Sequence, residues 1–238
     1  MTINVKDTID RARRIVQDET SVRWPLPEWL LWFNDAISEL ALYKPTAFAV
    51  SAPFALAAGT YQKAPADSQS VLRVTRNLKT VDSEARQGGL AIRAVDRDML
   101  DSQNPNWHDT AITTPTRIVR NVAYDIAEPN AFWVYPPNDG TGIIELIVSK
   151  PPAPVATPSS PDSLASYNTN VEVQSVFAGA VLDFILYRAY SKDSTFSGSA
   201  ARAAAYYSAF ANAVGINALN VKTFNLNTKP SLQEENRA

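Results

Sequence analysis

The segment from residue 24 to residue 43 reads WPLPEWLLWFNDAISELALY and decides the fold. Proline suits the first turn of a helix, where its missing N–H would have no partner, so Pro25 and Pro27 favour a helix start near Leu26. Pro45 ends the helix, because the residue before a proline is disfavoured in helical conformation. The apolar positions are Leu30, Phe33, Ile37 and Leu40 on one stripe, with Trp29, Trp32 and Ala36 on a second face. A helix from Leu26 to Tyr43 that is apolar on two sides needs two neighbours.

Helical patterns also occur at both ends of the chain. The first covers about residues 5–18, with Asn4 as the expected N-cap. Two more cover about residues 171–190 and 196–214, and Gly215 fits the position that follows the last helix. A two-helix piece at either end would expose its apolar stripe if it stood alone. The two pieces therefore most economically bury those stripes against each other.

The middle of the chain has the character of strands. The strand-like segments are residues 47–54, 71–75, 90–95, 117–125, 131–135 and 143–149. Asn138-Asp139-Gly140 lies between the last two segments and predicts a hairpin, since these residue types tolerate the positive φ that such turns require. Asp96 is expected to cap a short helical turn through Leu100. These patterns predict a small antiparallel β domain with long loops.

The predicted fold is therefore of the α+β class. Residues 1–45 and 162–219 are expected to form an antiparallel helical bundle, and residues 46–150 an antiparallel β domain inserted into it. Residues 151–161 contain five prolines and are expected to form an extended linker. Residues 220–238 are polar, lack a helical period and are expected to form an extended C-terminal tail.

Composition narrows the classes of function. The 238 residues include 22 basic and 24 acidic side chains without a basic run, so the electrostatic footprint of a dedicated nucleic-acid binder is absent. The lack of cysteine excludes disulfides, thiolate metal sites and a cysteine nucleophile, and the single histidine excludes sites that need two imidazoles. The polar N-terminus does not resemble a secretory signal, and no apolar run has the length of a membrane span. We expect a soluble protein made in a reducing cytoplasm.

Some residues resemble parts of metal or phosphate sites. Asp96, Asp98 and Asp101 form a sparse cluster of possible metal ligands, but no glycine or downstream glutamate follows at calcium-loop spacing. A helix cap and a solvated turn are therefore the preferred interpretation. The glycine clusters at residues 88–89 and 140–142 match no phosphate loop and are expected to be turns. No cofactor is expected.

A hydrolase is a distant alternative. His108 and Asp109 are two of the three groups of a catalytic triad, but no G-x-S-x-G elbow supplies a nucleophile. Trp107 and His108 are better interpreted as a loop anchor whose indole packs on the sheet. A glycosidase would need two converging carboxylates, such as Asp96 and Asp109, and sequence alone does not show convergence. We therefore expect no enzymatic activity.

Aromatic residues suggest a rival function of a different class. Trp24, Trp29 and Trp32 can in principle stack on a sugar ring, but their helical spacing favours the core. The rival is a carbohydrate-binding or adhesin module of a virion or cell surface. Its binding residues would be Trp107, Trp133 and Tyr135.

Two sets of residues are candidates for contacts with other proteins. The apolar residues of the tail alternate with polar ones, which suits an extended segment laid along a partner, although an inert end is an equal alternative. These tail residues are Phe224, Leu226, Pro230 and Leu232. The candidates for packing between identical subunits lie on the second helix and on the last two helices, where alanines allow close approach and cations suit a helix C-terminus. They are Trp29, Trp32, Arg188, Lys192, Ala200 and Ala204.

Short motifs recur in a fixed order along the chain as far as about Gly215. The first are Arg23-Trp24-Pro25 and Glu28-Trp29-Leu30-Leu31-Trp32-Phe33-Asn34-Asp35-Ala36. The pattern Leu-x-x-Gly-Thr-x-Gln-x-x-Pro-x-Asp is matched, with one extra residue before the glycine, by Leu56, Gly59, Thr60, Gln62, Pro65 and Asp67. Further motifs are residues 74–77, 95–97, 100–101, 105–108, 129, 132–137 and 188–193. In these motifs the chain resembles the head-to-tail adaptor proteins (connector or head-completion proteins) of tailed bacteriophages. Each match is weak alone, and their shared order makes the resemblance specific.

The resemblance, which extends to the tail tubular protein A-like adaptors of short-tailed phages, implies a structural role in the neck of the virion after assembly in the host cytoplasm. It implies a homo-oligomeric ring, typically dodecameric, under the portal protein, with the helical bundles side by side around a DNA channel. The β domain would face the tail tube or nozzle protein, and the C-terminal segment would dock on the portal. DNA would pass without sequence-specific binding, which fits the lack of a basic patch, and no membrane contact is implied.

Overall fold

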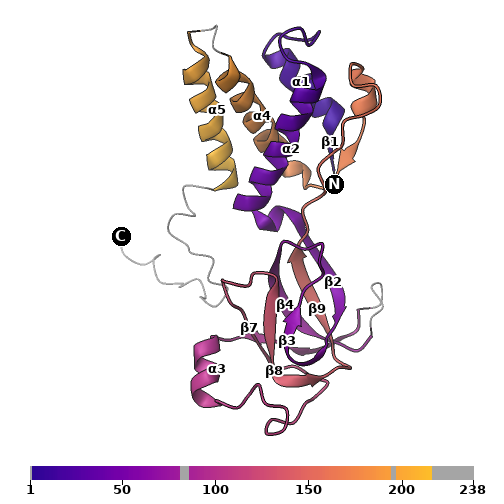
Figure 1. Ribbon diagram of the computed structural model, residues 1–238, viewed down its shortest axis with the longest axis vertical. Coiled ribbons are helices and arrows are strands. Elements are labelled where there is room, and N and C mark those ends of the chain that lie inside the picture. The colour runs from indigo at the N-terminus through magenta and orange to yellow at the C-terminus, as the bar shows by residue number, and fades with distance from the viewer. Residues whose placement is uncertain (1, 81–85, 194–196, 216–238) are drawn as a thin grey trace. The chain divides into compact units, whose positions relative to one another are not determined.

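The computed structural model describes residues 2–80, 86–193 and 197–215 (Figure 1). These residues form two compact units. One comprises the described residues up to 48 and those from 151 onward, and the other comprises the described residues between 49 and 150. Both helices and antiparallel sheets are present, so the fold belongs to the α+β class.

The first unit is helical. Its long helices are α1 (Val5–Ile15), α2 (Leu26–Tyr43), α4 (Ala178–Lys192) and α5 (Ser199–Val214). Its short elements are the strands β1 (Ile3–Asn4) and β10 (Asn170–Val171) and the 3-10 turns η1 (Pro45–Phe48), η2 (Leu164–Tyr167) and η3 (Ser175–Phe177). β1 and β10 pair antiparallel, which attaches the start of the chain to the segment before α4.

Local signals set most helix ends. The Asn4 side chain accepts a hydrogen bond from the Asp7 N–H at 3.1 Å, which confirms the expected N-cap of α1. The bounds of α2 agree with those predicted from its prolines. Gly215 follows α5 with φ at 84°, and its N–H bonds the Ala211 carbonyl at 2.9 Å, so the expected glycine cap is confirmed.

Two helix boundaries differ from those predicted. α1 ends at Ile15 because the Asp18 carboxylate accepts hydrogen bonds from the backbone N–H groups of the following turn, among them that of Trp24 at 3.1 Å. The helix expected from residue 171 begins at Ala178. Val171 ends β10 and Val173 lies in the turn that follows, where its N–H donates to the Val171 carbonyl at 2.9 Å. Both side chains are buried from this non-helical segment.

A single hydrophobic core joins the described residues before residue 49 to those after residue 150. Buried side chains from all four long helices contribute to it, including Ile9, Phe33, Ile185 and Phe210. α2 packs against both α1 and α4, so the two apolar faces of this helix are covered within the chain. Trp24, Trp29 and Trp32 meet edge to face with ring centroids 5.0–5.8 Å apart, as the core interpretation of these indoles requires.

The second unit contains two four-stranded sheets and one helix. The first sheet has the order β2 (Ala49–Ala55), β9 (Ile143–Ser149), β4 (Ser70–Leu78) and β5 (Gly88–Ala91). The second has the order β3 (Ala58–Lys63), β8 (Ala131–Asp139), β7 (Asn121–Ala123) and β6 (Arg93–Ala94). Helix α3 spans Arg97–Gln103. Buried residues of both sheets, including Val74, Val122, Phe132 and Ile144, share one core.

The structure corrects several expectations for this unit. The predicted hairpin at residues 138–140 is wrong, because β8 pairs with β3 and β7 while β9 pairs with β2 and β4. The turn between them passes from one sheet to the other. The pairing of β6 with β7 is parallel, so the unit is not purely antiparallel. β3 was not predicted, because its sequence Ala-Gly-Thr-Tyr-Gln-Lys lacks an apolar alternation.

None of the helices in the described ranges combines the length and the apolar character that a bilayer crossing requires.

Candidate functional site

The acidic residues of α3 stabilise its ends and the adjoining loop. Asp96 caps the helix by accepting the Asp98 N–H at 3.0 Å, and the Asp101 carboxylate accepts the Trp107 indole N–H at 2.7 Å. Asp109 closes a turn by accepting the Ala111 N–H at 2.8 Å. In the part of the chain that the structure describes, no three His, Cys, Asp or Glu side chains converge to hold a metal ion. The cap-and-turn interpretation of the aspartates agrees with this geometry.

His108 serves as a loop anchor. Its Nδ1 lies 2.8 Å from the Thr60 hydroxyl on β3, and its ring packs against Trp107 with centroids 3.7 Å apart. Burial, and secondly the nearby Arg97 guanidinium, lower the pKa of His108, so the neutral imidazole is favoured. The His108 ring bonds Thr60 and the Asp109 carboxylate accepts the Ala111 N–H of its own turn, so the hydrogen bonds of both residues have a structural use.

Two of the three aromatic residues of the rival carbohydrate site are covered by the chain itself, and the third, Tyr135, is half-buried. Trp107 is fully buried, and Trp133 is 6% exposed. The Arg97 guanidinium lies 4.5 Å from the centroid of the Trp133 ring, and the Tyr61 ring lies 5.5 Å from it. Tyr135 packs its ring against Trp107. Stacking on a sugar needs an exposed aromatic face, so these residues do not form the binding platform that the rival function needs.

The residues of the Leu-x-x-Gly-Thr-x-Gln-x-x-Pro-x-Asp pattern build one corner of the second unit. Gln62 is 1% exposed. Its amide accepts the Ala57 N–H at 2.8 Å and donates to the carbonyls of Ala57 and Gly59, at 2.9 and 3.2 Å. Gly59 has φ at 99°, a region that favours glycine. The amide of Gln62 thus closes the turn that glycine makes possible.

The rest of the pattern anchors neighbouring segments. Thr60 bonds His108, as described above, and the Pro65 carbonyl accepts the Ser68 N–H at 3.0 Å. Asp67 forms an ion pair with Lys150 at the end of this unit. The pattern therefore has a structural use here, in which side chains and backbone hold loops to strands.

The six candidates for subunit packing fall into three groups. Trp29 and Trp32 are 0% and 6% exposed in the core of the chain itself, so they offer no surface to another subunit, and that expectation is corrected. Arg188 pairs with Asp35 at 2.8 Å, and Lys192 pairs with Glu28. These two cations join α4 to α2 within one subunit.

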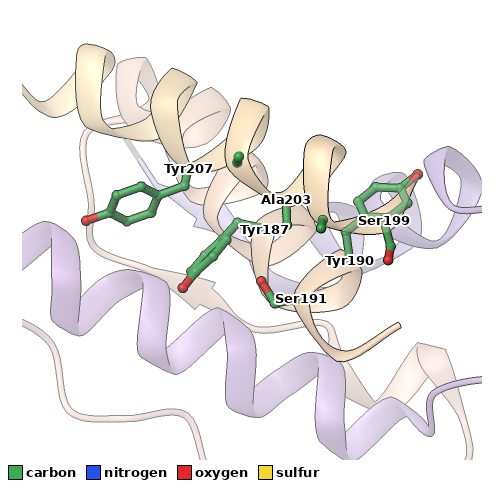
Figure 2. A pocket seen from close by; sticks show the side chains of 8 residues that line it. Tyr187, Tyr190, Ser191, Ser199, Ala203 and Tyr207 are labelled. Carbon is green, nitrogen blue, oxygen red and sulfur yellow. The ribbon is translucent and has the colours of Figure 1, made fainter. Parts of the chain in front are cut away.

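Ala200 and Ala204 are exposed and lie in an open groove of about 420 Å³ between α4 and α5 (Figure 2). The groove is lined by Tyr187, Tyr190, Ser191, Ser199, Ala200, Ala203, Ala204 and Tyr207. The rings of Tyr187 and Tyr207 lie with centroids 5.0 Å apart at one end, and Tyr190 lies at the other (Figure 2). The Arg202 guanidinium donates to the Tyr190 hydroxyl at 3.3 Å. The groove thus combines aromatic walls with a floor of small side chains.

The two alanines were named from the sequence as packing candidates, whereas the tyrosines of the groove were not. An apolar period does not tell which side of a helix a neighbour covers. The proposed docking residues Phe224, Leu226, Pro230 and Leu232 lie outside the described residues.

Comparison with known proteins identifies one family. A search of curated proteins finds no match. The family model described as SU10 adaptor protein matches residues 3–227, which is nearly the whole chain and includes both units described above. The chain therefore belongs to the SU10 adaptor protein family.

Proposed function

We propose that this protein is a structural head-to-tail adaptor in the neck of a tailed phage, where it forms a ring that joins the portal to the tail and surrounds the DNA channel. The observation that carries the proposal is the adaptor family match over residues 3–227. Interaction with portal and tail components follows from membership of this family. The ring, its dodecameric number and the kinship with adaptors of short-tailed phages are parts of the proposal.

The helical unit supports the proposed ring. Its four long helices share a core and are proposed to act as an antiparallel bundle, so the unit can bear load as one body. α5 has an exposed face of small residues, including Ala200 and Ala204, that permits close approach of a neighbour. Contacts between different faces of identical subunits close into a ring when the rotation between them is regular. The proposed work is mechanical and involves no covalent chemistry.

The proposal can be tested by mixing the purified chain with the portal assembly of its own phage and imaging the complex by cryo-EM. The expected result is a ring of added density coaxial with the portal, into which the helical unit fits repeatedly. Portal alone, and portal mixed with an unrelated protein of similar size, are the controls. Portal particles that stay bare at micromolar concentrations of the chain would refute the proposed function.

The C-terminal tail is proposed to dock on the portal through Phe224, Leu226, Pro230 and Leu232. Deletion of residues after Val221 should leave a folded protein with greatly reduced portal binding, because the extended segment supplies the contact. Circular dichroism checks the fold, and co-sedimentation with portal measures binding. A matched variant with the four residues replaced by serine separates their contribution from that of chain length. Unchanged affinity of the truncated protein would rule out this docking role.

A further inference from the structure

The groove between α4 and α5 has a chemistry that fits a proline-rich strand. Its walls are tyrosine rings and its floor is alanine, and Tyr207 is 39% exposed. Aromatic grooves bind extended proline-rich segments because flat rings pack on the pyrrolidine faces, and because such segments lose little entropy on binding.

The chain carries a segment of this kind in the same unit. Residues 151–158 contain four prolines and form neither helix nor strand. Asn34 on α2 clamps the segment at Val155, donating to its carbonyl at 3.0 Å and accepting its N–H at 3.0 Å. Val155 packs against the core, while Ala153, Pro154 and Ala156 are exposed. The clamp thus presents a preorganised proline-rich surface, which lowers the entropic cost of binding.

Helix α5 and residues 151–158 lie on opposite sides of the helical unit (Figure 1). α5 packs on α4, whereas the segment is fixed to α2 and is followed by η2, which packs on α1. This arrangement prevents a subunit from filling its own groove with its own segment. It is the arrangement that a head-to-tail contact between copies requires.

The charges at the two sides are complementary. α5 carries Arg202 and no acidic residue, and the Arg202 guanidinium lies 5.5 Å from the centroid of the Tyr190 ring, which lines the groove. Residues 151–177 carry Asp162 and Glu172 and no basic residue. Glu172 is exposed and shares a second open groove of about 430 Å³ with Pro152, Ala153, Val155 and Ala156. Opposite charge beside each contact surface favours one register and disfavours contacts between like sides.

From these observations we propose that the groove between α4 and α5 of one copy receives residues 152–157 of the next copy. This inference rests on the proposed ring and names the surfaces that close it. Tyr187 and Tyr207 pack on Ala153 and Pro154 of the neighbour, and the neighbour's Glu172 lies toward Arg202. The contact is heterologous, so every copy uses both surfaces once.

Cross-linking tests the contact directly, because the chain contains no cysteine. The variant Ala153→Cys/Ala204→Cys is assembled on portal and treated with a short bismaleimide. The expected product is a ladder of covalent oligomers that extends beyond the dimer, whereas an equal mixture of the two single variants gives covalent dimers only. The matched control Ala153→Cys/Ala205→Cys places its second thiol on an exposed alanine outside the groove, and should give much weaker ladders.

A blocking variant gives a second test. Ala204→Arg fills the groove and is expected to lower the fraction of portals that carry a ring by about tenfold or more, because the proline segment would have to desolvate an unpaired cation. Ala205→Arg should assemble as the unsubstituted chain does. Circular dichroism checks that both variants fold.

The outcomes separate the two proposals. The groove contact would be overturned if rings form on portal but Ala153→Cys/Ala204→Cys gives no ladder of cross-linked oligomers. It would also be overturned if Ala153→Cys/Ala205→Cys gives the stronger ladder. Either result would leave the adaptor function standing. Absence of any ring with the unsubstituted chain would overturn both proposals.

Discussion

Glu145 connects three strands of the second unit through its carboxylate. It accepts hydrogen bonds from the Thr75 hydroxyl at 2.8 Å and the Arg76 guanidinium at 2.9 Å on β4. It also accepts from Arg86 at 3.2 Å, and Arg86 donates in turn to the Ser51 carbonyl on β2 at 2.8 Å. The hydrogen bond from Thr75 is the largest cause that lowers the pKa of Glu145, and Arg76 and Arg86 lower it further.

This network makes stability dependent on pH. Because the pKa of Glu145 is lower in the folded chain, its contribution is fully present above the unfolded value near 4.5 and is lost as the pH falls through the folded value. Glu145→Gln should cost about 1–3 kcal/mol at pH 7, since a hydrogen-bonded and largely buried carboxylate is removed. Urea denaturation at pH 7 and at pH 3 measures the difference, which should shrink at the lower pH.

The exposed Glu19 provides the matched control. Glu19→Gln should change the free energy of unfolding by less than about 0.5 kcal/mol at both pH values. A Glu145→Gln penalty that grows toward pH 3 would contradict the role given to this carboxylate.

Asn138 shows why the turn between β8 and β9 was predicted as a hairpin. Its side chain is fully buried and accepts the N–H groups of Gly140 and Gly142 while donating to the carbonyls of Thr116 and Arg117, at 2.9–3.1 Å. The Asn-Asp-Gly signal correctly located a turn, and Gly140 has φ at 88°. A turn motif does not indicate which strands pair with the segments before and after it. The passage of the chain from one sheet to the other was therefore not predictable from Asn-Asp-Gly.

At the scale of elements, α2 is the helix on which the first unit is organised. Trp29→Ala should destabilise the chain by about 3–5 kcal/mol, because it removes a fully buried indole from the core. Leu31 lies two residues along the same helix and is 62% exposed, so Leu31→Ala should change stability by less than about 0.5 kcal/mol. Thermal or urea denaturation compares the two variants. If Trp29→Ala has normal stability and fails only in assembly, the core role of Trp29 is contradicted and the indole contacts another subunit instead.

The attachment of the proline segment to α2 is a second testable feature. Asn34→Ala removes both hydrogen bonds to Val155 and should accelerate proteolysis near residues 151–158 by about fivefold, since roughly 1 kcal/mol of local stability is lost. Limited proteolysis with elastase followed by mass spectrometry measures the rate. Ser38→Ala, an exposed position one turn further along α2, should be cleaved at the original rate. Equal rates for both variants would show that the clamp does not hold the segment.

The sequence predicted elements best where the determining signal is local. The bounds of α2, the Asn4 cap and the Gly215 cap each depend on residues within one or two turns of helix. β3 was missed because its sequence lacks an apolar alternation and its partner strand, β8, is distant in the sequence. The start of α4 was misplaced because Val171 and Val173 are buried without being helical. The candidate surface was predicted in part for the same reason. Ala200 and Ala204 are exposed, so their proposed packing against another subunit stays open, whereas Trp29 and Trp32 are buried in the core of the chain itself.

At the scale of the whole molecule, the chain places its two kinds of structure in separate units. The ends of the chain make a helical unit whose core includes residues from both, and the middle makes a unit of two sheets. In the proposed ring, lateral contacts and contacts along the axis can be assigned to different units. The hydrogen bonds of Gln62, Asn138 and Glu145 hold loops to strands in the second unit. A unit held in this way would present a defined surface to a tail protein.

The central claim is that this chain forms the ring between the portal and the tail. A cryo-EM reconstruction of the neck of the phage that encodes it, at a resolution that traces side chains, tests this claim most directly. We predict a closed ring of this chain under the portal, with the helical units side by side around the channel and the proline segment of each copy in the α4–α5 groove of its neighbour. A neck in which other proteins fill that position, with no density for this chain, would contradict the account.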